Sequence, residues 1–288
     1  MGRRLIILLG PTAVGKTDYS LELAEQYGSP IISCDSRQIY KEMSIGTAVP
    51  TREQLERVHH YFIHSHSITG LYTAGMYEAD ALNLIHSLFK QGHETLIMTG
   101  GSMFYIDAVC NGIADVPKGD PIIREALWKR KEDEGLEALA AELREADPQT
   151  WDRIDRNNPQ RVIRALEVFK CSGKPLSSFR LDSAKERDFE IEKIGLRRSR
   201  EDLYSRIDRR VISMMDEGLL NEVRSLNEFR NLTAMQTVGY KELFCHLDDP
   251  ESFPLDEAVS KIQQHTRNYA KRQMTWWRSD SAIRWKDL

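Results

Sequence analysis

Apolar residues in the first hundred positions form short runs separated by stretches with helical spacing. The runs Leu5–Leu9, Pro30–Cys34 and Thr95–Thr99 have the length expected of strands in a buried sheet. Between them, Thr17–Tyr27 and about Ala74–Gln91 are predicted helices. Strands that alternate with helices favour a parallel sheet with right-handed crossovers. The pattern therefore predicts an α/β fold.

The pattern changes after residue 112. From Pro121 to about Gly173 the chain contains only amphipathic, charge-rich helical segments. One helix start is marked clearly, because Asn158 is a good N-cap residue and Pro159 suits the first helical position. This part of the chain is predicted to be a helical insertion.

The chain returns to the sheet after the insertion. Residues 189–196 alternate apolar and polar side chains with the period of a strand. Three helical stretches are predicted to follow, the longest from about Leu255 to Arg278. We therefore predict a catalytic core of residues 1–113 and 188–288, interrupted by a helical domain of residues 114–187.

Composition agrees with this organisation and excludes several classes of protein. The chain has 288 residues, of which 41% are apolar and 29% charged, so disordered and fibrous architectures are excluded. Its four cysteines are scattered and form no Cys-x-x-Cys pair, which favours a reducing compartment. No apolar run reaches the roughly 18 residues that span a bilayer, and Leu5–Leu9 is too short for a signal peptide. We expect a cytoplasmic protein with no membrane partner.

A phosphate-binding loop follows the first predicted strand. Residues 10–17 fit the pattern G-x-x-x-x-G-K-[ST] and lie directly before a predicted helix. In such a loop the backbone N–H groups and the helix N-terminus bind an anion, the lysine adds a charge and the hydroxyl ligates Mg²⁺. A glycine-rich turn without a ligand is the alternative, and the match in both context and spacing favours the phosphate site. The predicted diphosphate-binding residues are Gly10, Pro11, Thr12, Ala13, Val14, Gly15, Lys16 and Thr17.

The nearest acidic candidate for chemistry is Asp35. The strand Thr95–Thr99 runs into Gly100-Gly101-Ser102 and offers no aspartate, whereas Asp35 ends the second predicted strand. In a parallel sheet that position lies at the same edge as the phosphate loop. Asp35 is therefore a candidate base or metal ligand, and the alternative is a cap for the turn that begins at Ser36.

These motifs together closely resemble those of the tRNA dimethylallyltransferases, also called tRNA isopentenyltransferases, of bacterial type. The resemblance implies a P-loop NTPase-like parallel sheet core with an inserted, mostly helical domain. It covers essentially the whole chain. The matching segments are residues 10–17, 32–40, 45–48, 100–102, 157–162, 164–168, 173–177, 238–241, 269–273 and 275–276.

The resemblance implies transfer of a dimethylallyl group from dimethylallyl diphosphate to N6 of the adenosine 3′ of a tRNA anticodon, with release of diphosphate. Asp35 would accept the proton of the amine, because that nitrogen is a poor nucleophile. Lys16, the loop amides and a Mg²⁺ ion on Thr17 would stabilise the departing diphosphate. Ser102 stands where the family usually has threonine, so its hydroxyl would touch the nucleotide or the diphosphate. Its alternative role is the N-cap of the helix that follows.

The resemblance also implies a tRNA-binding surface, on which the target base leaves its stack. Residues 236–240 combine amides, a glycine and an aromatic ring, which suits contact with unstacked bases. For residues 160–164 the alternative is simply the exposed face of a helix. The predicted tRNA-binding residues are Asp35, Ser36, Arg37, Gln38, Ser102, Arg124, Gln160, Arg161, Val162, Ile163, Arg164, Gln236, Thr237, Val238, Gly239, Tyr240 and Lys241.

Two other clusters have structural and functional interpretations. The histidine cluster at residues 59–66 has no carboxylate or cysteine at metal spacing, which favours a packing role over a metal site. Trp276 and Trp277 stand beside Arg272 and Arg278, as in a stacking platform for nucleic acid, but packing of the last helix on the sheet is favoured.

The net charge of −4 averages over unlike regions. Residues 161–210 contain 14 basic and 9 acidic side chains, and residues 261–288 contain 7 and 2, so each region is +5 by subtraction. Residues 120–160 contain 7 basic and 11 acidic side chains, a local −4. We therefore expect salt-sensitive binding of tRNA to the positive segments.

Three rival functions stay open on the sequence. They are an isopentenyltransferase acting on free adenine nucleotides, a phosphate-loop kinase for a small metabolite, and a non-enzymatic RNA-binding protein. The helical insertion and the basic segments favour a macromolecular acceptor over a free nucleotide. Lys16, Thr17 and Asp35 together disfavour a protein without activity. We expect the enzyme to act as a monomer.

Overall fold

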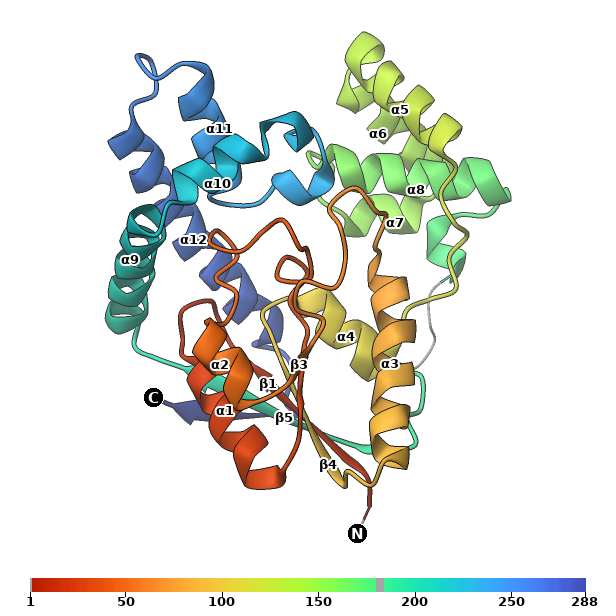
Figure 1. The fold of residues 1–288 in the computed structure, drawn as a ribbon. Helices are drawn as coiled ribbons and strands as arrows, with labels where there is room; N and C mark the ends of the chain where they lie inside the picture. Colours follow the sequence, from red (N-terminus) through yellow and green to blue (C-terminus); the bar gives the residue numbers. More distant parts are fainter. Residues whose placement is uncertain (1, 180–183) are drawn as a thin grey trace. The chain divides into compact units, whose positions relative to one another are not determined.

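A parallel β-sheet forms the centre of the larger part of the chain (Figure 1). The computed structural model describes residues 2–179 and 184–288, and within these residues six strands pair in the order β3-β2-β4-β1-β5-β6. Each neighbouring pair in this order is parallel. The strands are β1 Arg4–Leu9, β2 Ile31–Ser33, β3 His60–Tyr61, β4 Thr95–Thr99, β5 Glu190–Arg197 and β6 Ile283–Asp287.

Four strands and the α/β class were predicted from the sequence and are confirmed. The strands β1, β2, β4 and β5 coincide with the predicted runs to within a residue or two. The edge strands β3 and β6 were missed. β3 has only two residues, and most side chains of β6 are exposed. Neither strand therefore contains the apolar run that marks a buried strand.

Alternate residues of β1 face opposite sides of the sheet and enter different cores. Leu5 and Ile7 pack with residues of α3, α4 and Trp277 on one face. Ile6 and Leu8 pack with α1 and α9 on the other face. The two helical layers thus bury both faces of the sheet, as expected for parallel strands. These helices are α1 Lys16–Tyr27, α3 Ala74–Lys90, α4 Met103–Asn111 and α9 Arg200–Asp216.

The chain after β5 contains one more helix than the sequence predicted. In the described residues four α-helices follow β5, so the prediction of three is wrong. α9 and α10 are separated only by Glu217 and Gly218, and Gly218 turns the chain with a φ of 100°. The longest predicted helix is confirmed as α12. The remaining helices of this part are α2 Arg52–Arg57, α10 Leu219–Ser225, α11 Tyr240–Asp248 and α12 Leu255–Trp277.

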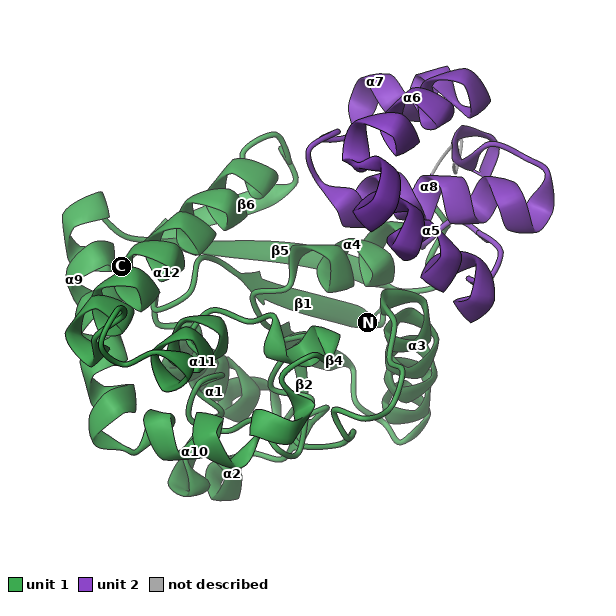
Figure 2. Ribbon diagram, turned by 90° about the horizontal axis from the view of Figure 1, so that it is seen from above, with its two compact units in different colours: residues 1–111, 185–288 green, residues 112–184 purple. Residues whose placement is uncertain are grey.

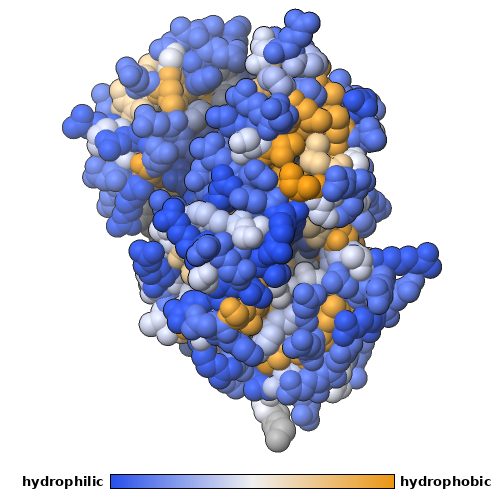
Figure 3. Space-filling model, turned by 90° about the vertical axis from the view of Figure 1, so that its left-hand side faces the viewer, coloured by the Kyte–Doolittle hydropathy of each residue, from blue (hydrophilic) through white to orange (hydrophobic). Residues whose placement is uncertain are grey.

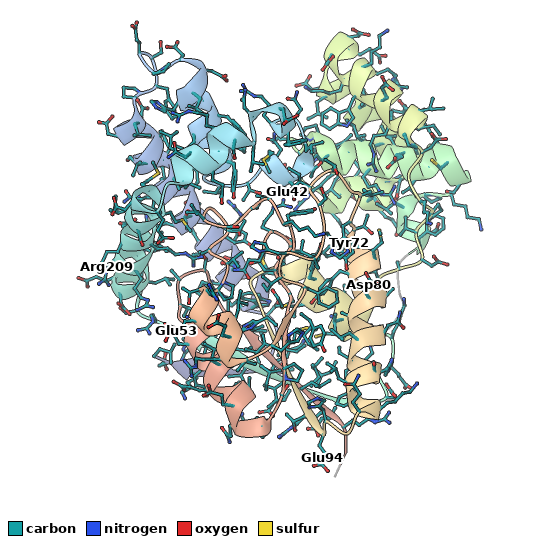
Figure 4. All side chains as sticks on the ribbon, in the orientation of Figure 1. Glu42, Glu53, Tyr72, Asp80, Glu94 and Arg209 are labelled. Atoms are coloured by element: carbon teal, nitrogen blue, oxygen red, sulfur yellow. The ribbon has the colours of Figure 1, made fainter. Side chains whose placement is uncertain are left out.

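The long segment between β2 and α3 has little regular structure and is held by side chains, several of them labelled in Figure 4. Glu42 accepts hydrogen bonds from the hydroxyl of Ser67 at 2.7 Å and from the N–H of Ile68 at 3.0 Å. The Tyr72 hydroxyl donates to Asp80 Oδ2 at 2.9 Å at the start of α3. These bonds substitute for the backbone pairing that a helix or strand would supply.

The chain forms two compact units, drawn in different colours in Figure 2. The first is Met1–Asn111 with Lys185–Leu288, and the second is Gly112–Ala184. The predicted boundaries lie within three residues of these. The second unit has its own apolar core, and the predicted N-cap is confirmed, because the Asn158 side chain accepts from the N–H of Arg161 at 3.3 Å. Its helices are α5 Pro121–Glu134, α6 Leu136–Ala146, α7 Pro148–Arg153 and α8 Pro159–Ser172.

No helix in the described part of the chain is long and apolar enough to cross a membrane. The face of the molecule drawn in Figure 3 is mainly hydrophilic, with its apolar residues gathered in a few patches.

Candidate active site

A cavity of about 860 Å³ lies in the first unit, where three parallel strands end. The loops that follow β1, β2 and β4 all contribute to its wall, as do α9 and α12. This is the edge of an open parallel sheet at which ligands bind. The residues at its centre are Lys16, Thr17, Asp35, Ser102, Arg210 and Gln273.

The phosphate loop has the backbone that anion binding requires. Gly10 has a φ of 148°, and a Cβ at this position would lie 2.7 Å from the carbonyl oxygen of Leu196, so only glycine fits. Gly15 has a φ of 110° and directly precedes α1. Among the described residues no side chain caps α1. The first N–H groups of the helix are therefore available to an anion.

Lys16 is held inside the loop. Its Nζ donates to the carbonyl oxygens of Gly10 and Pro11, each at 2.9 Å. Burial and, to a smaller extent, the nearby Arg210 lower the pKa of Lys16 to about 8, although Asp35 partly opposes the shift. Because its charge is only partly compensated, the ammonium group favours a bound anion.

Three arginines surround the same loop, and sequence reasoning gave them no role. Arg198 Nε donates to the carbonyl of Val14 and Arg206 Nε to that of Ala13, both at 2.8 Å. On α9, Arg210 lies one turn beyond Arg206, and both line the cavity. Burial lowers the pKa of the Arg210 guanidinium, while Asp35 opposes the shift. The charge excess of residues 161–210 was the available signal, but it did not say which arginines face the loop.

Asp35 caps the turn with one carboxylate oxygen and leaves the other without a hydrogen bond to the described residues. Its Oδ1 accepts hydrogen bonds from the backbone N–H groups of Arg37 at 2.8 Å and Gln38 at 3.3 Å, so it does cap the turn. Its Oδ2 makes no hydrogen bond with any described residue, and the side chain lines the cavity. One carboxylate oxygen is thus fixed by the loop and the other is free to accept a proton.

Ser102 joins two loops through its hydroxyl, which does not cap a helix. Its Oγ accepts from the N–H of Ser36 at 2.8 Å and donates to Ser36 Oγ at 3.0 Å. Only the backbone carbonyl of Ser102 bonds to the first turn of α4, through Tyr105 and Ile106. Ser102 thus stands at the N-cap position that the alternative interpretation gave it, but its hydroxyl bonds across the site to the loop after β2.

Gln273 links the phosphate loop to the loop after β4, a role that the sequence did not reveal. This residue of α12 is fully buried. Its Oε1 accepts from the N–H of Thr12 at 2.9 Å, and its Nε2 donates to the carbonyl of Gly101 at 2.8 Å. The hydroxyl of Tyr269, one turn earlier, donates to the same carbonyl at 3.1 Å. The segment 269–273 matched the family pattern, but only the fold shows what it touches.

The structure divides the predicted tRNA-binding segment at residues 236–241. Residues 236–239 line the cavity. Tyr240 is fully buried, and its hydroxyl donates to Glu222 at 2.6 Å, so its prediction as a ring for unstacked bases is wrong. Lys241 is exposed at the start of α11.

Of the other predicted tRNA-binding residues, Ser36, Arg37 and Gln38 line the cavity of the first unit, whereas Arg124 and residues 160–164 lie in the second unit. Gln160 and Arg161 are exposed on α8, as the alternative interpretation of this segment expected. Val162 and Ile163 are buried in the core of this unit, so their prediction as RNA contacts is wrong for the side chains. Two arginines meet at one buried carboxylate: Glu167 Oε2 accepts from Arg124 at 2.9 Å and from Arg164 at 2.7 Å.

The histidine cluster orders a loop. His60 Nδ1 lies 2.7 Å from the carbonyl of Val58, and His64 Nε2 lies 3.2 Å from Ser44 Oγ. Burial lowers the pKa of His60. No group of histidines, cysteines or carboxylates in residues 2–179 and 184–288 is arranged to hold a metal ion.

Trp276 and Trp277 differ in how deeply they are buried. Trp277 is 2% exposed and packs on the sheet, which confirms the packing interpretation for this residue. Trp276 is 45% exposed, and its Nε1 donates to Asp107 Oδ2 at 2.8 Å, so packing on the sheet was the wrong interpretation for Trp276.

The fold and the site define an α/β protein of P-loop NTPase-like fold whose phosphate loop opens into a positively charged cavity. Residues 38–280 match the family model described as IPP transferase. The chain belongs to the IPP transferase family.

Curated relatives of the chain are enzymes of tRNA modification. It is 51% identical to tRNA dimethylallyltransferase 1 of Bacteroides thetaiotaomicron over 281 residues, which cover 98% of this chain and 90% of the relative. It is 52% identical to tRNA dimethylallyltransferase 2 of Parabacteroides distasonis over 281 residues, which cover 98% and 93%.

Solved structures show the same fold. The full-length tRNA isopentenylpyrophosphate transferase of Bacillus halodurans has a TM-score of 0.70 at 34% identity, covering 99% of this chain and 90% of that one. A eukaryotic dimethylallyltransferase acting on tRNA has a TM-score of 0.81 at 25% identity, covering 99% and 74%.

Proposed function

We propose that this protein transfers a dimethylallyl group from dimethylallyl diphosphate to N6 of the adenosine 3′-adjacent to the anticodon of certain tRNAs. Diphosphate leaves. The observation that carries the proposal is the cavity itself, which is lined by a phosphate loop and by a carboxylate with one oxygen that has no hydrogen-bond partner among the described residues. The names of the relatives agree with a dimethylallyl donor and a tRNA acceptor.

The diphosphate binds at the phosphate loop. The free N–H groups at the start of α1, the Lys16 ammonium and the Arg210 guanidinium all favour negative charge there. Charge on the diphosphate increases as its bond to carbon breaks, so these groups stabilise the transition state more than the bound substrate. No phosphoryl group moves, and the loop holds a leaving group.

Thr17 is the protein ligand that fits a Mg²⁺ ion. Its side chain lines the cavity, and its hydroxyl makes no hydrogen bond with the described residues. Mg²⁺ takes few protein ligands and binds substrate phosphates directly, which suits a single hydroxyl beside a diphosphate. When bound, the ion neutralises charge on the leaving group.

Asp35 activates the acceptor. The lone pair of an exocyclic adenine amine is delocalised into the ring, so the nitrogen becomes nucleophilic only as its proton is removed. Asp35 Oδ2 accepts that proton while Oδ1 stays hydrogen-bonded to Arg37 and Gln38. The carboxylate therefore does not need to leave its position during the reaction. Ser102, through Ser36, holds the loop that presents it.

The tRNA contacts residues of the first unit that line the cavity on the acceptor side, and it contacts exposed residues of the second unit. Residues 236–239 line the cavity, and Lys241 is exposed beside them. In the second unit Gln160 and Arg161 are exposed, and Glu167 orients Arg124 and Arg164. Arginine and lysine contacts to phosphates give affinity without sequence information.

The decisive experiment incubates the protein and Mg²⁺ with labelled dimethylallyl diphosphate and an unmodified anticodon stem-loop that carries consecutive adenosines. We expect the label on the RNA and release of one diphosphate per transfer. Parallel reactions with free AMP and with ATP plus small-metabolite acceptors test the two enzymatic rivals. Absence of label on the RNA, or transfer to AMP with equal efficiency, would contradict the proposal.

A further inference from the structure

Glu222, a residue of α10 outside the sequence motifs, binds four hydrogen-bond donors. Its Oε2 accepts from the backbone N–H groups of Ser44 at 3.0 Å and Ile45 at 2.8 Å. Its Oε1 accepts from the N–H of Gly46 at 3.0 Å and from the Tyr240 hydroxyl at 2.6 Å. One carboxylate thus joins three consecutive backbone amides to the start of α11.

The aromatic ring of Tyr240 packs directly against the same loop. A Cβ added to Gly46 would lie 2.5 Å from Cε2 of Tyr240, so a larger residue at position 46 does not fit. Burial raises the pKa of Tyr240, and the neighbouring Glu222 adds to the effect. The phenol therefore keeps its proton and remains a donor to the carboxylate.

The two segments that Glu222 joins are walls of the cavity. Residues 46–48 line it from the loop after β2, and residues 236–239 line it from the turn before α11. Glu222 is not among the residues that line the cavity in the described chain. It lies behind both walls, and its contacts set their separation.

The first wall is also connected to the candidate base. Gln38 Nε2 donates to the carbonyls of Thr47 at 3.1 Å and Ala48 at 2.9 Å. The backbone N–H of Gln38 donates to Asp35 Oδ1 at 3.3 Å. A continuous set of contacts therefore runs from Asp35 through Gln38 and the loop to Glu222.

We propose that Glu222 is a positioning residue for the acceptor: it holds the two walls in the arrangement that receives the target nucleotide beside Asp35. The proposal rests on the proposed function. The phosphate loop takes no part in these contacts, because Lys16 and Gln273 hold it through separate bonds. Loss of the Glu222 carboxylate should therefore impair the acceptor side and leave the diphosphate side intact.

The substitution Glu222→Gln tests the proposal with a change of only one atom. The carboxylate offers two acceptor oxygens, and each receives two donors. A glutamine amide has one acceptor oxygen, and its NH₂ group would face two donors. Buried donors without acceptors are costly, so the loop should leave its position. Glu228→Gln is the matched control, because Glu228 is exposed six residues further along.

Steady-state kinetics separate the two substrates. For Glu222→Gln we expect the KM for the anticodon stem-loop to rise about tenfold, with the KM for dimethylallyl diphosphate within about twofold of wild type. Glu228→Gln should have the wild-type KM for the RNA and for dimethylallyl diphosphate. Tyr240→Phe removes one of the four donors to Glu222. It should raise the KM for the RNA by less than Glu222→Gln does and leave the KM for dimethylallyl diphosphate unchanged. An unchanged KM for the RNA in Glu222→Gln, or equal rises for both substrates, overturns the proposal.

Hydrogen exchange provides a measurement that is independent of activity. The amides of residues 44–46 should exchange slowly in wild type and at least about tenfold faster in Glu222→Gln, whereas those of β1 should not change. If wild type transfers no dimethylallyl group, the proposed function fails. This measurement still tests whether Glu222 holds residues 44–46. Equal exchange of residues 44–46 in both proteins contradicts the role of Glu222. If Glu222→Gln does not fold, Tyr240→Phe provides the kinetic comparison, and an unchanged KM for the RNA in this variant contradicts the proposal.

Discussion

Gln273 accepts a hydrogen bond from the backbone N–H of Thr12 at 2.9 Å, which joins the last long helix to the phosphate loop. The other end of the same amide donates to Gly101 at 2.8 Å. A Cβ on Gly101 would lie 2.6 Å from Gln273 Nε2, so the glycine allows the close approach. The wall of the cavity at the phosphate loop is therefore completed by a residue far from the loop in sequence.

The first prediction concerns this residue. Gln273→Ala leaves the N–H of Thr12 without its acceptor and removes one of the two donors to the carbonyl of Gly101, which should lower the free energy of unfolding by about 1–3 kcal/mol. It should also raise the KM for dimethylallyl diphosphate more than the KM for RNA. Chemical denaturation and steady-state kinetics check both effects. Gln264→Ala, at an exposed position of the same helix, is the control and should match wild type. A larger effect on the RNA would contradict the assignment.

The second prediction concerns Asp35. Asp35→Ala should lower turnover by about 10² to 10⁴, the usual range for a general base, while affinity for RNA largely survives. Asp35→Asn keeps an acceptor for the N–H groups of Arg37 and Gln38, so it should fold like wild type and still lose turnover. Single-turnover transfer and RNA binding are the measurements. If Asp35→Ala abolished RNA binding but kept normal single-turnover chemistry, the role of Asp35 would be recognition.

The third prediction concerns the proton on Lys16. Burial places its pKa at about 8 in the ligand-free protein, so a growing fraction is neutral above that pH. A bound diphosphate favours the charged form and should therefore cause proton uptake near pH 8.5. Calorimetry in buffers of different ionisation enthalpy measures that uptake. Lys16→Met provides the baseline for protons taken up by diphosphate itself, and equal uptake in the two proteins would refute the prediction.

The same pKa has a consequence for stability. The folded-state pKa of Lys16 lies below the ordinary lysine value of 10.5, so the unfolded chain binds more protons between pH 8 and pH 10.5. The contribution of this group to the free energy of unfolding must then rise with pH across that window. Wild type and Lys16→Met can be denatured at several pH values. The free energy of unfolding of wild type should increase with pH relative to that of the variant. A constant difference would show that Lys16 titrates normally.

A fourth prediction tests the RNA surface. Lys241→Ala should weaken RNA binding and reduce the slope of log affinity against log salt concentration by about one, as expected for one lost phosphate contact. Lys90→Ala is the control, because Lys90 is exposed at the end of α3 that leads into β4, away from the strand ends that form the cavity. A salt titration of stem-loop binding measures both slopes. Equal slopes for the two variants would show that Lys241 makes no phosphate contact with the RNA.

Local patterns determined most of the architecture. The apolar runs of β1 and β4, the Asn158-Pro159 helix start and the loop of residues 10–17 depend on neighbours within a few positions, and each is where the pattern indicated. The position of Asp35 at the same sheet edge as that loop also followed, because parallel strands carry their carboxyl ends to one side. The two edge strands were not predicted, because β3 has only two half-buried residues and β6 has mainly exposed ones, so neither contains an apolar run.

The sequence by itself thus determined the fold class, the glycine-rich loop before α1 and the position of Asp35 at the same edge of the sheet. Only the tertiary structure decided which side chains support them: Arg206 and Arg210 beside the loop, Gln273 across two loops and Glu222 behind the acceptor walls. It also reversed the expected orientation of Tyr240, which is buried. The physical reason is that these contacts join residues far apart in the chain, so their partners are set by packing and not by spacing.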